Sequence, residues 1–128
     1  MFSVYKIENG RMNVPEPEYF DVGGSADISV GETLSLSSGK LVKNTTAPTH
    51  VSLANAAKGA TAVPVCRIEK NQVYAVSCAK SPASFTVGAK LTLSSDGLEV
   101  DSASDGGVVT IVDTLGAKAI GDTILVRF

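Results

Sequence analysis

The sequence lacks tryptophan and has little histidine, cysteine or aromatic character. Its 128 residues include one histidine, two cysteines and 5% aromatic residues. A platform that stacks sugars, or a face that stacks bases, needs several aromatic side chains, and this sequence offers few for either. The single histidine, His50, stands in no partner motif for a general base or a nucleophile. These absences favour a structural or binding role over catalysis, and we expect no enzyme activity.

Patterns for metal, nucleic acid and membrane are missing too. His50, Cys66 and Cys78 are spaced by 16 and 12 residues, which fits no zinc pattern. The net charge is −2 and the 11 basic residues are scattered singly. The sequence therefore offers no basic stripe that could contact a phosphate backbone. No stretch approaches the roughly 20 apolar residues of a membrane span, and residues 1–8 do not resemble a secretory signal. We expect a soluble protein made in a cytosol, with no cofactor, metal, small-molecule substrate, nucleic acid or membrane partner.

Cys66 lies in the first strand of a predicted hairpin over residues 62–77, and Cys78 follows its second strand. A two-residue turn between its strands would set each cysteine against an apolar residue rather than against the other cysteine. Buried free thiols at Cys66 and Cys78 are therefore favoured over a disulfide. Pro64, inside the first strand of this hairpin, predicts an edge position or a bulge.

One phrase recurs along the chain. Residues 30–41, VGETLSLSSGKL, return at residues 87–98 as VGAKLTLSSDGL, a shift of 57 positions with seven of twelve residues identical. A shorter echo, GDTILV, lies at residues 121–126. Apolar residues two positions apart indicate half-buried strands. Each unit therefore predicts a turn, a strand, a tight turn and a strand, over residues 30–43 and 87–100.

The tight turn of the first unit is Ser38-Gly39, which suits the positive φ angles of a type I′ hairpin. A two-residue turn there places Leu36 opposite Leu41. Such a pairing sets apolar against apolar across the two strands.

The second unit has the stronger turn signal, Asp96-Gly97, and two possible registers. An Asp-Gly turn places Leu93 opposite Val100, whereas exact superposition of the repeats places Leu93 opposite Leu98. Both keep apolar against apolar, so the choice stays open. Two ordinary hairpins with similar turns also explain the repeat as well as a duplication does.

Residues 1–27 differ in character from the rest of the chain. Pro15 and Pro17 remove backbone donors and fix φ, which predicts an extended arm with one short strand at residues 2–7. Such an arm either lies over its own domain or reaches a neighbour. Over residues 28–128, short strands with turns every eight to twelve residues predict a single all-β domain. We expect a small β-barrel or β-sandwich of about eight short strands.

Several segments together resemble the head decoration, or capsid cement, proteins of tailed bacteriophages. They are ISVGETL at 28–34, SGKL at 38–41, VSL at 51–53, VPV at 63–65, VG at 87–88, DGL at 96–98, GVVTIV at 107–112 and AIGDTILVRF at 119–128. The resemblance covers roughly residues 28–128.

The resemblance implies a small, often trimeric β domain on the outer surface of the virion head, made in the host bacterial cytoplasm. It implies two partners, the major capsid protein and other copies of the chain in a homotrimer. An N-terminal arm of such proteins commonly reaches the shell or an adjacent subunit. The candidate contact residues of the arm are Tyr5, Pro15, Pro17, Tyr19 and Phe20.

A ligand- or carbohydrate-binding adhesion module is the competing class. It would need an exposed aromatic or polar cluster, for which Tyr5, Tyr19, Phe20 and Tyr74 are the candidates. Tyr19 and Phe20 could equally anchor the arm, which we prefer.

Overall fold

The protein is all-β in the computed structural model, which describes residues 1–10 and 12–128. Every regular element in this part of the chain is a strand, as predicted. The described residues form eleven strands rather than about eight, in part because β1 and β2 precede residue 28. The strands are β1 (Ser3–Ile7), β2 (Pro17–Phe20), β3 (Thr33–Ser37), β4 (Lys40–Lys43), β5 (His50–Ser52), β6 (Val63–Arg67), β7 (Gln72–Ser77), β8 (Lys90–Leu93), β9 (Val100–Ala103), β10 (Val109–Asp113) and β11 (Thr123–Arg127).

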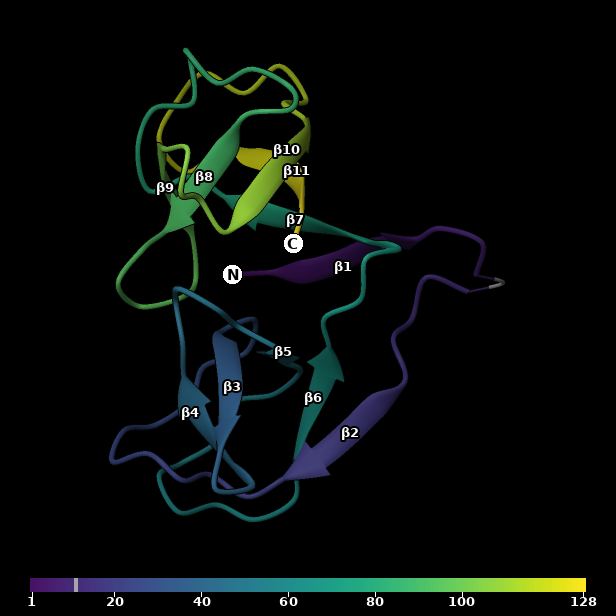
Figure 1. Ribbon diagram of the computed structural model, residues 1–128, viewed down its shortest axis with the longest axis vertical. Coiled ribbons are helices and arrows are strands. Elements are labelled where there is room, and N and C mark those ends of the chain that lie inside the picture. The colour runs from purple at the N-terminus through teal and green to yellow at the C-terminus, as the bar shows by residue number, and fades with distance from the viewer. Residues whose placement is uncertain (11) are drawn as a thin grey trace.

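The strands form two antiparallel sheets, which occupy the upper and lower halves of Figure 1. The six-stranded sheet has the order β1-β7-β11-β10-β8-β9, and the five-stranded sheet has the order β2-β6-β5-β3-β4. Neither sheet closes into a barrel over the described residues. Of the two architectures predicted, the arrangement is therefore consistent with a β-sandwich.

Strands β2 to β6 and strands β7 to β11, here called the first unit and the second unit, have the same topology. Across the sheets, the order β2-β6-β5-β3-β4 corresponds strand for strand to β7-β11-β10-β8-β9. The registers agree as well. Phe20 pairs with Val63 in the first unit, and Val76 pairs with Ile124 at the equivalent place in the second.

Equivalent parallel bridges join the outer strands of each unit. Val22, just after β2, pairs with Leu41 in β4, and Cys78, just after β7, pairs with Val100 in β9. Two hairpins that share only a turn would not share these long-range pairings. The agreement therefore supports an internal duplication.

The three repeated glycines occupy the same kind of turn. Gly31, Gly88 and Gly121 have φ angles of 76°, 88° and 87°, values that glycine adopts without a Cβ clash. In each turn the residue after the glycine donates its N–H to the carbonyl two residues before the glycine, at 3.1 Å. This turn precedes β3, β8 and β11, so the repeated phrase marks the starts of strands.

The first repeated hairpin forms as predicted. Residues 38 and 39 both have positive φ, and Leu36 lies opposite Leu41. In the second hairpin Leu93 lies opposite Val100, which is the register of the Asp-Gly alternative.

The predicted hairpin over residues 62–77 is wrong. β6 lies between β2 and β5, whereas β7 lies between β1 and β11 in the other sheet, so each strand already has two neighbours. Pro64 is consequently in an interior strand rather than at an edge. Its carbonyl accepts the N–H of Leu53 at 3.0 Å, one residue past the end of β5. Proline has no N–H to return a bond on that side, and regular pairing with β5 ends at Ser52.

Strands β1 and β2 lie along the rest of the domain, which is one of the two placements considered for the arm. β1 pairs with β7 and β2 pairs with β6, so strand pairing crosses residue 27 in both sheets. Phe2 is 2% exposed, and its ring lies 6.4 Å from that of Tyr74 and 5.3 Å from that of Phe128.

Each unit has its own buried cluster. The first consists of Val22, Ile28, Leu34, Leu41, Val63 and Val65. The second consists of Tyr74, Val76, Cys78, Leu91, Leu93, Val100, Val109, Ile111, Ile124 and Val126, together with Phe2 and Val51. Phe2, from the first residues of the chain, thus completes the core of the second unit.

Candidate functional site

Three of the five candidate contact residues lie on β2, and the strand separates them. Tyr19 is 60% exposed, whereas Phe20 points to the opposite face and packs against the first buried cluster. This alternation is the period of a strand. Pro17 is exposed at the start of β2. Tyr19 is therefore available to a partner, and Phe20 anchors the strand.

The other two candidates lie before β2. Tyr5 is 55% exposed and stands at an irregularity of β1, between the residues that pair with Tyr74 and Val73. Pro15 is half-buried in the connection from β1 to β2. The five candidates thus do not form one cluster, and Tyr5 and Tyr19 are their exposed aromatic members.

The connection between β1 and β2 carries two residues that sequence reasoning missed. Met12 and Val14 are 71% and 70% exposed. In Figure 1 the described parts of this connection, residues 8–10 and 12–16, extend away from both sheets. Met12, Val14, Tyr5 and Tyr19 are here called the N-terminal apolar group. The sequence offered little indication of Met12 and Val14, because one methionine and one valine among turn residues show neither a strand nor a helix period.

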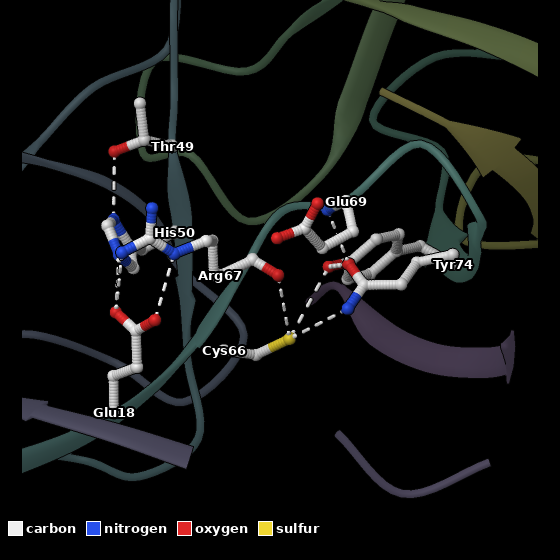
Figure 2. A network of polar contacts seen from close by, with 8 residues as sticks. Glu18, Thr49, His50, Cys66, Arg67, Glu69 and Tyr74 are labelled. Carbon is white, nitrogen blue, oxygen red and sulfur yellow. Dashed lines mark hydrogen bonds and ion pairs between the residues drawn. The ribbon is translucent and has the colours of Figure 1, made fainter. Parts of the chain in front are cut away.

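A polar network fastens β2 to its sheet (Figure 2). Glu18 Oε1 accepts a hydrogen bond from Arg67 Nε at 2.8 Å, and Glu18 Oε2 lies 3.3 Å from His50 Nε2. The other ring nitrogen of His50, Nδ1, lies 2.8 Å from Thr49 Oγ1. Thus one carboxylate on β2 joins residues of β5 and β6.

The charges of this network reinforce one another. The pKa of Glu18 is lowered mainly by the hydrogen bond from Arg67. The hydrogen bond with His50 lowers it further, whereas partial burial acts to raise it. Glu18 in turn raises the pKa of Arg67. His50 is 3% exposed and meets the ring of Phe20 edge-on, with centroids 5.5 Å apart. Because both ring nitrogens already have protein partners, the arrangement suits holding β2 in place.

A second network joins the two sheets. Tyr74 Oη donates a hydrogen bond to Gln72 Oε1 at 2.6 Å, and it lies 3.7 Å from Cys66 Sγ. Gln72 Nε2 completes the group by donating to Cys66 Sγ at 3.5 Å. Burial raises the pKa values of both the Cys66 thiol and the Tyr74 phenol. Cys66 and Cys78 are buried free thiols, as predicted.

Exposed apolar side chains also occur in the second unit. Val87, Leu115 and Ile120 are 66%, 53% and 70% exposed, and they are here called the loop apolar group. The connections that carry them lie at the end of the six-stranded sheet farthest from the first unit (Figure 1). Sequence reasoning did not single them out, because each is one apolar residue inside a turn.

The described residues hold no group of three or more His, Cys, Asp or Glu side chains placed to ligate a metal ion. Nor do they include a helix with the length and apolar character needed to cross a bilayer.

No protein-family model and no curated protein matches this sequence.

Proposed function

We propose that this chain is a structural protein, a head decoration protein of a tailed bacteriophage that binds the outside of the expanded head and stabilises it. The observation that carries the proposal is the N-terminal apolar group. Met12 and Val14 are exposed on a connection that projects from a body built of two packed units. Contiguous apolar surface that is exposed to solvent marks a site for contact with another protein.

Two exposed apolar groups suit the two kinds of contact that such a protein makes. In this proposal the N-terminal apolar group contacts the major capsid protein, and the loop apolar group contacts other copies in a homotrimer. Each contact is weak by itself. Symmetry lets three arms bind together, so the entropy lost on binding is shared among them. This task requires no reaction chemistry.

The test is binding to expanded, undecorated heads of the phage that encodes the chain. The double variant Met12→Ser/Val14→Ser should reduce the number of bound copies per lattice site and keep the circular dichroism spectrum unchanged. Leu53→Ser is the matched control, because Leu53 is an exposed apolar residue outside both groups. Full binding by the double variant would refute the role given to the connection, and failure of the unmodified chain to bind would refute the capsid proposal itself.

The homotrimer has a separate test. Light scattering of the free protein gives its mass, and Leu115→Ser/Ile120→Ser should shift a trimer toward monomer. An unmodified chain that is monomeric in solution and binds heads as single copies would contradict self-association.

A carbohydrate-binding adhesion module is the second candidate, favoured by the exposure of Tyr5 and Tyr19. Tyr74 is completely buried and Phe20 packs on the core, so only two of the four aromatic candidates are presented to solvent. A glycan array and a tyrosine-fluorescence titration test this candidate. Saturable sugar binding that is lost in Tyr5→Ser or Tyr19→Ser would favour it over the capsid proposal.

A further inference from the structure

Strand β2 forms one edge of the five-stranded sheet. Its counterpart in the second unit, β7, has β11 on one side and β1 on the other, whereas β2 has only β6 beside it. Figure 1 shows β1 next to β7, and among the described residues no strand takes the same position next to β2. The first unit therefore leaves open the edge that the second unit covers.

The backbone of Tyr19 faces this open edge. Tyr19 pairs with Pro64, which has no N–H and whose carbonyl accepts the N–H of Leu53 on the β5 side. The two residues therefore form a non-hydrogen-bonded pair, in which the backbone groups point away from each other. Two residues further on, the carbonyl of Asp21 accepts the N–H of Leu41 on the side away from β6. The N–H and the carbonyl of Tyr19 thus point outward from the sheet.

Pro17 limits the open edge without closing it. By the same alternation its backbone points outward, so its carbonyl is a further acceptor, whereas its nitrogen offers no donor. Its counterpart in β7 is Val73, which stands at the irregularity of the ladder between β1 and β7. A partner strand can therefore bond to the Tyr19 N–H, the Tyr19 carbonyl and the Pro17 carbonyl.

The side chains on the inner face of β2 are less covered than their counterparts in β7. Val76 and Tyr74 are 1% and 0% exposed, and Phe2, just before β1, packs against the same core. The equivalent residues of β2 are Phe20 and, two residues earlier, Glu18. Phe20 is only half-buried, and the side chain of Glu18 is 34% exposed. These are the side chains that a strand added beside β2 would cover.

A pocket of about 460 Å³ lies at the start of β2, and its lining is acidic. Glu16, Glu18 and Glu69 supply three carboxylates to it. Arg67 supplies the one cation of the lining, and its guanidinium is bound to Glu18. A strand antiparallel to β2, with an apolar residue opposite Phe20, places the residue four positions further on opposite Glu16 and on the same face. A basic residue at that position would meet the excess of negative charge.

We propose that the edge of β2 binds an extended segment of a partner protein, which adds to the five-stranded sheet as β1 adds to the six-stranded one. The segment runs antiparallel to β2. It carries an apolar residue opposite Phe20 and, four positions further on, a basic residue opposite Glu16. In strand addition of this kind the main-chain bonds supply the affinity and the side chains supply the selectivity.

A second copy of β2 fits this edge less well than such a segment. Pairing two Tyr19 residues about a twofold axis sets Pro17 of each strand opposite Asp21 of the other. Pro17 has no N–H to donate, and the carbonyl of Asp21 already accepts the N–H of Leu41. Only the bonds between the two Tyr19 residues would then form.

The probe is the peptide acetyl-Leu-Thr-Val-Thr-Lys-Thr-amide, which places leucine opposite Phe20 and lysine opposite Glu16. Titration into the isotope-labelled full chain should give saturable amide shifts at Tyr19 and its neighbours in β2. The matched peptide with an N-methyl group on the first threonine cannot donate to the Tyr19 carbonyl. It should bind at least about tenfold more weakly. Glutamate in place of the lysine should weaken binding roughly three- to tenfold, because like charges then meet.

Two variants of Tyr19 separate the main-chain bonds from the side chain. Tyr19→Pro removes the outward N–H and no bond to β6, so it should abolish the shifts in a folded chain. Tyr19→Ser keeps the N–H, and as the control it should bind the probe within about twofold of the unmodified chain. If Tyr19→Pro unfolds the protein, the N-methyl peptide makes the same comparison on the unmodified chain.

Four results would overturn the proposal. Shifts that do not saturate, or equal binding of the N-methyl peptide, would exclude strand addition. Equal binding of the glutamate peptide would exclude a basic partner. A dimer of the unmodified chain that Tyr19→Pro converts to monomer would assign the edge to a second copy instead. The inference does not depend on the partner being a capsid, so failure to bind phage heads would leave it standing.

Discussion

The backbone N–H of Thr33 donates a hydrogen bond of 3.0 Å to the carbonyl of Gly97. Thr33 begins β3 in the first unit, and Gly97 lies in the turn between β8 and β9 in the second. The bond therefore ties the two repeated hairpins to each other. Gly97 has a φ of 73°, and a Cβ on it would lie 2.6 Å from Thr33 Oγ1. Glycine is required here both by the backbone conformation and by the close approach of the units.

Gly97→Ala and Gly116→Ala separate those two requirements. Gly116 has a φ of 74°, and nothing lies within 4 Å of a Cβ placed on it. Gly116→Ala should therefore cost only the strain of the left-handed conformation, roughly 1 to 2 kcal/mol. Gly97→Ala should cost about 1 to 3 kcal/mol more, because the contact between the units is overpacked. Urea denaturation measures both free energies of unfolding, and equal losses would show that the units do not depend on this contact.

Phe2 makes the N-terminus part of the folded body. Phe2→Ala should lower the free energy of unfolding by about 3 to 5 kcal/mol, because it empties space beside Tyr74 and Phe128. Tyr5→Ala, at an exposed position of β1 three residues further on, is the control and should change stability by less than about 1 kcal/mol. Thermal and urea denaturation test the pair, and a stable Phe2→Ala variant would show that β1 is a detachable arm.

The same contacts change how the arm must be tested. Removing residues 1–20 would delete β1 and β2 and leave Tyr74 and Phe128 without Phe2. We therefore expect such a truncation to unfold the domain, so its loss of binding would say nothing about contacts. Point substitutions at Met12 and Val14 avoid this confusion.

The repeated hairpins could be predicted because their structure is local. The turn at residues 38–39 needs positive φ, and Ser-Gly supplies it, so the pairing of Leu36 with Leu41 depends only on neighbouring residues. The 57-residue shift also pointed to the duplication that the strand order supports. In the second hairpin, two registers satisfied the same local rules, and only the fold distinguishes them.

Long-range pairing could not be predicted from local pattern. β6 and β7 are adjacent in the chain, and both are apolar, which is typical of a hairpin. Their partners β2 and β1 come from a segment whose prolines indicated an extended arm. The exposure of Tyr19 and the burial of Phe20 depend on which face of β2 meets β6, and composition does not specify that face.

The ion pair on β2 predicts a dependence of stability on pH. The pKa of Glu18 lies below its usual 4.5 in the folded protein, mainly because Arg67 donates to it. A lowered carboxyl pKa stabilises the fold above the unfolded-state value, and this contribution is lost as the pH falls through the folded-state value. The unmodified chain should therefore be more stable than Glu18→Gln at pH 7, and the difference should shrink by about pH 3.

Urea denaturation at the two pH values measures this difference. Glu16→Gln, at an exposed position two residues earlier, is the control for removing one negative charge. A gap between the unmodified chain and Glu18→Gln that stays constant from pH 7 to about pH 3 would contradict the ion pair.

The two thiols should be inert in the folded protein. Burial, with smaller effects of the charges of Asp122 and Glu99, raises the pKa of Cys78 to about 11. Burial also raises the pKa of Cys66. The thiolate is the reactive form, and at pH 8 a group of this pKa is ionised in only about one molecule in a thousand. A disulfide-exchange reagent should therefore label neither thiol until denaturant is added, and then label both.

Ser84→Cys gives the reference rate for this experiment, because Ser84 is exposed. The introduced thiol should react at once in the native protein, while Cys66 and Cys78 stay unlabelled. Their labelling rate then reports opening of the fold, since each sulfur becomes accessible only when its core is disrupted. Cys66 labelling would follow separation of the two sheets, because its sulfur contacts Gln72 and Tyr74 of the opposite sheet. Native labelling of either cysteine as fast as the introduced one would show that these cores are not closed.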